Sequence, residues 1–190
     1  MAVNSTMLPL GTPAPAFTLP EPLSGSSVSL EDFPQPALLV MFICNHCPYV
    51  QHVRRGLVQL RADYGEAELG MVAISANDPT NHPGDAPERL AEEAQAQGYR
   101  FPYLFDESQE TAKAYTAACT PDFFLFGPDR RLAYRGRLDA SRPGTDVPVT
   151  GEDLRRAIDA LLGGEQVDAR QYPSLGCSIK WRAGNEPAYA

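Results

Sequence analysis

The sequence has little basic charge and no long apolar run. Lysine and arginine number 16 against 24 aspartates and glutamates, so the formal net charge at pH 7 is −8. An acidic chain of this kind is a poor ligand for nucleic acids or anionic membranes, which attract basic surfaces. The longest apolar run, residues 37–43, is far shorter than the ~20 residues that cross a bilayer. Because the first ten residues also lack the basic and apolar regions of a secretory signal, we expect a cytoplasmic protein with no nucleic-acid or membrane partner.

Cysteine is also scarce, with four in 190 residues, which excludes a secreted disulfide scaffold. A chain of this length buries roughly 70% of its surface and needs no such scaffold. The spacing is more informative than the number. Cys44 and Cys47 form a C-x-x-C motif, whereas Cys119 and Cys177 stand alone. Near a β-α-β pattern this motif indicates redox or metal-binding chemistry.

A strand, a helix and a second strand are predicted around the motif. The unbroken apolar run 37–43 is typical of a strand covered on both faces. After Cys47 the apolar residues recur every three or four positions, as on one face of a helix: Val50, Val53, Leu57, Leu60 and Tyr64. Residues 69–75 form another apolar run. Residues 37–75 therefore predict a β-α-β unit with parallel strands.

The remaining elements predict an α/β sandwich with a mixed sheet. They are a helix over 85–97, a strand over 101–105, a helix over 108–115, a β-hairpin over 123–138 and a last helix that opens at 150–153. Asp153 is expected to complete a variant of the capping box at that last helix. Arg135 and Arg137 are expected on a solvated face of the hairpin. We assign residues 1–164 to one domain and 165–190 to a C-terminal tail packed on it.

The C-x-x-C motif lies at the junction between a predicted buried strand and a predicted helix. A thiolate on Cys44 would face the unpaired N–H groups and the positive end of the helix dipole. Such a position lowers a cysteine pKa from about 8.5 to roughly 3.5–7.5, and a protonated His46 would act in the same direction. Cys47 would then release the mixed disulfide, as thiol–disulfide exchange requires.

Two other interpretations of the cysteines stay open. Cys44 and Cys47 would be inert if they only filled the core. They would bind zinc if His46, His52 or Cys119 completed the four ligands that zinc usually takes, although none of these has a recognised spacing.

Thr120-Pro121 precedes the apolar strand of the hairpin. A cis bond at this point would turn the Thr120 backbone so that it pairs with an extended substrate. We therefore expect Thr120 and Pro121 beside the two cysteines. Cys119 and Cys177 are possible auxiliary thiols.

Three segments in this order resemble the thioredoxin-like superfamily: residues 42–49, 119–124 and 176–181. The entry at 14–19 resembles the AhpC/TSA (redoxin) branch, and the chain is most similar to peroxiredoxin-like bacterial thioredoxin-family proteins over about residues 8–187. The resemblance implies a three-layer thioredoxin-like sandwich with an N-terminal extension and a C-terminal tail. It also implies an oxidoreductase that needs no cofactor and no metal.

The sequence departs from the motifs of these families. With Cys47 aligned to the peroxide-reducing cysteine of a peroxiredoxin, Val40 and Cys44 replace the proline and threonine of its Pro-x-x-x-Thr-x-x-Cys motif. Leu38 stands where thioredoxins carry a buried acid. These differences argue against fast peroxide reduction and leave the proton acceptor unassigned. His46 resembles the middle histidine of the more oxidising members, which favours the thiolate form.

The sequence therefore predicts a thiol–disulfide oxidoreductase in which Cys44 attacks, Cys47 resolves, and Thr120-Pro121 docks the substrate. The predicted partners are protein or small-molecule disulfides and thiols, with a thioredoxin- or glutathione-type electron donor. A thiol peroxidase and a non-catalytic thiolate metal-binding module are the alternatives.

Overall fold

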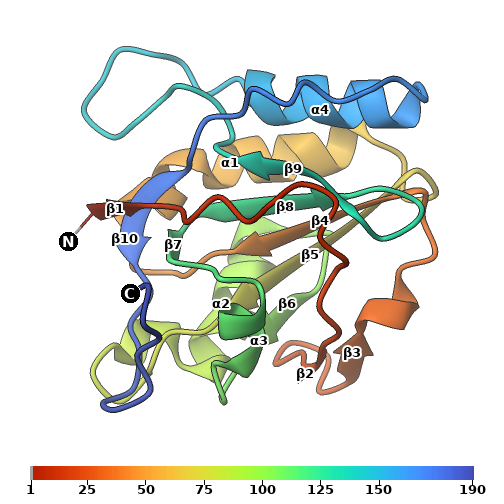
Figure 1. Cartoon of the computed structure of the whole chain (residues 1–190). Helices are drawn as coiled ribbons and strands as arrows, with labels where there is room; N and C mark the ends of the chain where they lie inside the picture. Colours follow the sequence, from red (N-terminus) through yellow and green to blue (C-terminus); the bar gives the residue numbers. More distant parts are fainter. Residues whose placement is uncertain (1) are drawn as a thin grey trace.

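A five-stranded mixed sheet lies at the centre of the computed structural model, which describes residues 2–190 (Figure 1). Its strands, in spatial order, are β6 (Tyr103–Phe105), β5 (Leu69–Ser75), β4 (Ala37–Phe42), β8 (Asp122–Phe126) and β9 (Leu132–Gly136). β4 is parallel to β5 and antiparallel to β8, and β9 is antiparallel to β8. The predicted mixed sheet is confirmed.

Helices and loops cover both faces of this sheet, which makes three layers. Successive side chains of a strand point to opposite faces, so Leu39 and Met41 of β4 join one buried cluster and Leu38 and Val40 join the other. The first cluster packs against α1 (Pro48–Asp63), α2 (Pro87–Gln97) and α4 (Glu152–Leu162). The second packs against α3 (Glu110–Ala114) and the N-terminal segment. Two 3-10 turns, η1 (Leu30–Asp32) and η2 (Pro83–Asp85), complete the helical elements of residues 2–190.

The junction from β4 to α1 forms as the sequence predicts. All residues of β4 are buried because both faces are covered. α1 begins at Pro48, which tolerates the first turn because its missing N–H has no intrahelical partner there. The predicted apolar stripe, represented by Val53 and Leu57, faces the sheet.

The predicted capping box of the last helix is wrong. α4 is preceded by Gly151 in the left-handed region (φ 70°), with no side-chain cap. The N–H groups of Thr150 and Gly151 instead donate to Oδ2 of Asp139 at 2.8 and 2.6 Å. Asp153 pairs with Arg137 at 2.7 Å. The carboxylate of Asp139, which follows β9, thus accepts the backbone N–H groups before α4, the role that the local spacing assigned to Asp153.

The prediction of a solvated Arg135 is also wrong. Arg135 is fully buried, 3.6 Å from Asp122 and above the ring of Phe124. Its N–H donates to Gln171 and its guanidinium to Thr6. Residues from both ends of the chain therefore cover this face of the hairpin. Because these residues lie far from the hairpin in the sequence, the hairpin sequence alone could not predict that Arg135 is buried.

A second, three-stranded sheet joins both chain ends to the centre of the molecule. Its order is β1 (Ala2–Asn4), β10 (Leu175–Ser178) and β7 (Cys119–Thr120), all antiparallel (Figure 1). β2 (Thr18–Pro20) and β3 (Ser27–Ser29) form a separate hairpin. The tail 165–190 thus supplies a strand to a sheet, while the boundary at residue 164 stays a prediction. Within residues 2–190, no helix is long and apolar enough to span a membrane.

Candidate active site

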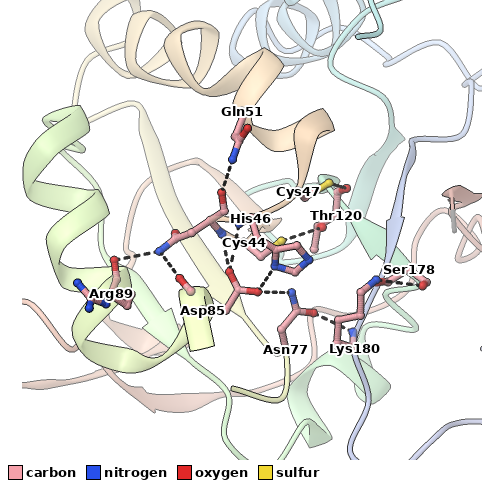
Figure 2. A network of polar contacts seen from close by, with 12 residues as sticks. Cys44, His46, Cys47, Gln51, Asn77, Asp85, Arg89, Thr120, Ser178 and Lys180 are labelled. Carbon is pink, nitrogen blue, oxygen red and sulfur yellow. Dashed lines mark hydrogen bonds and ion pairs between the residues drawn. The ribbon is translucent and has the colours of Figure 1, made fainter. Parts of the chain in front are cut away.

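Cys44, Cys47 and the Thr120-Pro121 pair meet at the start of α1. Cys47 is the residue directly before the helix, and Cys44 follows β4 by two residues. The Cys47 thiol donates to the Thr120 carbonyl at 3.1 Å, and the Cys44 sulfur lies 3.3 Å from the Thr120 hydroxyl (Figure 2). The Thr120-Pro121 bond is cis. The structure therefore brings together residues that are more than seventy positions apart in the sequence.

The two sulfurs are closed off from solvent in this conformation. Cys44 is 1% exposed and Cys47 is fully buried. Cys177 on β10 adjoins Cys47 and is only half-buried. All four cysteines are free thiols. Access to the pair therefore requires an opening of the site or a route through a neighbouring residue.

The surroundings of the two sulfurs favour a thiolate on Cys47. The neighbouring Cys44 thiol lowers the pKa of Cys47 to about 4, aided by the Cys177 thiol and the N–H of Val50 and opposed by burial.

Cys44 has the opposite surroundings. The Cys47 sulfur, burial and the Asp85 carboxylate raise the pKa of Cys44 well above its usual range, although the Thr120 hydroxyl acts against them. The prediction that the helix start lowers the pKa of Cys44 is therefore reversed. The physical reason is that Cys44 lies buried beside the Cys47 sulfur and the Asp85 carboxylate, whereas the helix begins only at Pro48, so that a first-turn N–H group, that of Val50, acts on Cys47.

Asp85 organises the loop between the two cysteines. This fully buried carboxylate accepts the N–H of Asn45 at 2.8 Å and contacts Nδ1 of His46 at 2.5 Å (Figure 2). The Asn77 amide donates at 2.8 Å to Oδ2 of Asp85, the oxygen that also contacts His46, and the Asn77 oxygen in turn accepts the N–H of Lys180 at 2.8 Å. His46 is thus held beside Cys44 as predicted, by a partner that the sequence analysis missed.

No local signal in the sequence identifies Asp85. The spacing predicts Asp85 as the first residue of a helix over 85–97, whereas Asp85 ends η2 and α2 begins two residues later at Pro87. Its burial is the only feature that separates it from an ordinary loop acid, and burial follows from tertiary packing. Figure 2 shows it between the cysteine loop and Asn77.

A metal ion would find three donor groups here. Atoms of Cys44, His46 and Asp85 lie within 4.8 Å of one another. Both Asp85 oxygens already accept hydrogen bonds, and zinc usually takes four ligands. The geometry therefore favours a hydrogen-bonded His–Asp pair. Of the histidines in the zinc interpretation, His46 belongs to this cluster, whereas His52 contacts Ser141 at 3.1 Å.

Cys119 lies in surroundings that differ from those of Cys44 and Cys47. Its thiol donates to the Pro121 carbonyl at 3.7 Å and it is fully buried. Burial and the nearby Asp122 carboxylate raise the pKa of Cys119 well above its usual range, against the effect of Arg135. These surroundings are those of an inert core cysteine.

The comparisons with known proteins identify the family of this chain. The model of the AhpC/TSA family matches residues 10–135. The chain belongs to the AhpC/TSA family. A candidate peroxiredoxin of Mycobacterium tuberculosis is 33% identical to this AhpC/TSA protein over 114 residues, which are 60% of this chain and 68% of the relative.

Solved structures similar to this AhpC/TSA protein show the thioredoxin-like fold. An uncharacterised conserved protein from Geobacillus kaustophilus is 52% identical, with a TM-score of 0.94 over 96% of this chain and 97% of the other. A candidate thiol:disulfide interchange protein, DsbE, from Chlorobium tepidum is 26% identical, with a TM-score of 0.64 over 82% and 99% of the two chains. The protein is thus a thioredoxin-like redoxin, in a family whose similar members carry the names of peroxiredoxins and disulfide oxidoreductases.

Proposed function

We propose that this protein is a thiol–disulfide oxidoreductase in which Cys47 attacks and Cys44 resolves. The observation that supports it best is the pair of thiols at a helix start, both in contact with Thr120 and with opposite pKa shifts. Thiol–disulfide exchange needs one sulfur that is a thiolate at neutral pH and a second that waits as a thiol. This order of roles is the reverse of the one predicted from the sequence.

The proposed reaction moves two electrons from the dithiol to the substrate. The Cys47 thiolate attacks one sulfur of a protein or small-molecule disulfide, and the first substrate sulfur leaves as a thiolate. Cys44 then gives up its proton and attacks the Cys47 sulfur, which releases the second substrate thiolate and leaves a Cys44–Cys47 disulfide. The two substrate sulfurs take up protons. A thioredoxin- or glutathione-type donor would return the disulfide to the dithiol.

His46 and Asp85 fit the role of accepting the proton from Cys44. The donor atoms of all three lie within 4.8 Å of one another. Asp85 contacts Nδ1 of His46, which leaves Nε2 as the free ring position. This pair would replace the buried acid that is absent at Leu38, a fully buried apolar residue of β4.

Thr120 and Pro121 position the thiols in this proposal, and substrate docking on Thr120 needs a further step. The Thr120 carbonyl already accepts the Cys47 thiol, and β10 already pairs with β7. An extended substrate could pair with Thr120 only after β10 moves.

Reduction of an insulin-type disulfide by single serine variants tests the proposal. Both Cys47→Ser and the double variant Cys44→Ser/Cys177→Ser should lose turnover. The double variant should accumulate a mixed disulfide with the substrate on Cys47, because the attacking thiolate remains and neither neighbouring thiol is left to release the substrate; Cys47→Ser should not. Cys119→Ser is the matched control and should keep full turnover. Full activity of either active-site variant would overturn the proposal.

A thiol peroxidase is the second candidate function, favoured by the similarity to a candidate peroxiredoxin. Cys47 would attack the peroxide, but Val40 and Cys44 occupy the positions of the supporting proline and threonine. Hydrogen peroxide turnover with a thioredoxin-type reductant would favour this function over disulfide exchange. A metal-binding module would instead copurify with stoichiometric metal in elemental analysis. A cytoplasmic location stays a prediction.

A further inference from the structure

β10 lies where an extended substrate strand would be expected to approach the site. It pairs antiparallel with β7, and Cys177 is the register partner of Thr120, the residue before the cis peptide bond. The pairing continues beyond β7, since the N–H of Ile179 donates to the Ala118 carbonyl at 3.1 Å. A segment of the chain itself therefore presents a cysteine to the C-x-x-C motif.

Gly176 allows this close approach. A Cβ at position 176 would overlap the Thr120 carbonyl, so only glycine lets β10 lie directly against the backbone of Thr120 and Pro121. The neighbouring Cys177 then packs against the buried cluster that contains Cys47, close enough for its thiol and its backbone N–H to lower the pKa of Cys47. The same contact, with burial as the larger cause, raises the pKa of Cys177 to about 11.

The three thiols differ in their access to solvent. Cys44 is 1% exposed and Cys47 is fully buried, whereas Cys177 is half-buried. An external thiol can therefore approach Cys177 more readily than either sulfur of the motif. If the motif is redox-active, Cys177 lies on the route between the buried disulfide and solvent.

We propose that Cys177 is a third redox thiol, which exchanges with the Cys44–Cys47 disulfide to form a Cys47–Cys177 disulfide that an external thiol can reach. The proposal rests on the proposed function, since it requires a disulfide at the motif.

The exchange is an isomerisation in which no electron leaves the protein. Cys177 loses its proton and attacks the Cys47 sulfur, so that the Cys44–Cys47 bond breaks and the Cys47–Cys177 bond forms. Cys44 leaves and takes up the proton. A thioredoxin- or glutathione-type thiol then attacks the Cys177 sulfur and displaces Cys47. A second thiol of that donor attacks the mixed disulfide, so two donor thiols are oxidised to a disulfide and Cys177 is released.

The attack of the external thiol on Cys177 displaces Cys47, and the pKa of Cys47 favours this order of steps. Exchange is faster when the departing thiol has a low pKa, and the surroundings of Cys47 lower its pKa to about 4, with the Cys44 thiol as the main cause. Attack on the half-buried Cys177 sulfur would thus release the sulfur that leaves most easily.

Peptide mapping of oxidised variants tests the proposal without relying on activity. The protein is treated with oxidised glutathione, its free thiols are alkylated under denaturing conditions, and cross-linked peptides are identified by mass spectrometry. Cys44→Ser should yield a Cys47–Cys177 cross-link as its main product, because Cys177 is then the thiol next to Cys47. Cys44→Ser combined with Cys177→Ser should instead retain glutathione on Cys47. Cys44→Ser combined with Cys119→Ser is the matched control and should keep the Cys47–Cys177 cross-link.

Two outcomes separate this proposal from the proposed function. If Cys44→Ser keeps glutathione on Cys47 while Cys177 stays free, Cys177 is not a redox partner, even where the wild-type protein forms a Cys44–Cys47 disulfide. If the wild-type protein forms neither a Cys44–Cys47 nor a Cys47–Cys177 disulfide, the proposed function fails as well. In the folded Cys177→Ser variant, the Cys44–Cys47 disulfide should form but steady-state turnover with a thioredoxin-type donor should be lost. Unchanged turnover would also overturn the proposal.

Discussion

At the scale of single residues, the two cysteines of one motif have different chemistry because different neighbours surround them. Cys47 precedes the helix and adjoins Cys177. Cys44 lies three residues further from the helix than Cys47 and faces the buried carboxylate of Asp85. A charge on one sulfur opposes a charge on the other, so the pair titrates as a unit in which the first proton leaves Cys47.

Asp85→Asn should lower the pKa of Cys44. The Asp85 carboxylate is one of the groups that raise this pKa, and its removal takes away a negative charge that opposes the thiolate. The measurement is the ultraviolet absorbance of the thiolate against pH in a Cys47→Ser background, where Cys44 is the remaining cysteine of the motif.

Asp78→Asn is the matched control for this titration. Asp78 is a buried loop carboxylate, but it contacts Thr80 and Asn81 rather than the cysteine loop. The Asp78→Asn substitution should leave the pKa of Cys44 unchanged. A Cys44 pKa that stays constant or rises in Asp85→Asn would contradict the role assigned to this carboxylate.

At the scale of secondary structure elements, β10 connects the tail to the site. It lies between β1 and β7, so the strand near the C-terminus and the strand at the N-terminus depend on each other. Ser174, directly before β10, also exchanges hydrogen bonds with Ser5 and donates to Gly136 at 2.8 Å. The tail is therefore a structural part of the active-site region.

Gly176→Ala should destabilise the protein by about 1–3 kcal/mol, the usual cost of overpacking a close contact. The added methyl group meets the Thr120 carbonyl and the Pro121 nitrogen, which are backbone atoms that cannot move aside freely. Urea unfolding of the reduced protein measures the change. Gly84→Ala is the control, since a Cβ at that position meets nothing within 4 Å. Equal stability of the two variants would show that β10 does not press against Thr120.

At the scale of the whole molecule, the low pKa of Cys47 links folding to pH and to redox state. The neighbouring Cys44 thiol is the main group that lowers this pKa, to about 4, whereas an unfolded cysteine titrates near 8.5. The folded state therefore favours the thiolate, which stabilises the reduced protein above the unfolded pKa. That stabilisation is lost as the pH falls towards the folded pKa.

The reduced wild-type protein should accordingly lose stability relative to Cys47→Ser as the pH is lowered from about 8.5 to 4. Comparison of the two proteins at each pH removes the contributions of groups that both contain, such as the buried Asp122. Urea unfolding at several pH values under a reducing agent measures the difference. If the difference in unfolding free energy between the wild-type protein and Cys47→Ser does not change with pH, Cys47 is not the thiolate of the folded protein.

Much of the fold could be predicted from the sequence because its signals are local. The unbroken apolar runs of β4 and β5 and the helical spacing of apolar residues after Pro48 can each be recognised within a short segment of the sequence. Order along the chain then sets a parallel β-α-β unit. The place of Thr120-Pro121 directly before the apolar strand of the hairpin also predicted it as a neighbour of the motif, and the contacts of Thr120 with both cysteines confirm this proximity.

Local patterns in the sequence predict the main helices, most strands of the central sheet and two thiols at a helix start, because periodicity and motif spacing act over a few residues. The short strands β1, β7 and β10, and the partners of all elements, follow from tertiary contacts. Asp85 reaches His46 and β10 brings Cys177 to Cys47 across long separations along the chain. Arg135 is buried for the same reason, since the segments that cover it come from both ends of the chain. Burial and charge at a site are sums over spatial neighbours, and those neighbours exist only after the chain has folded.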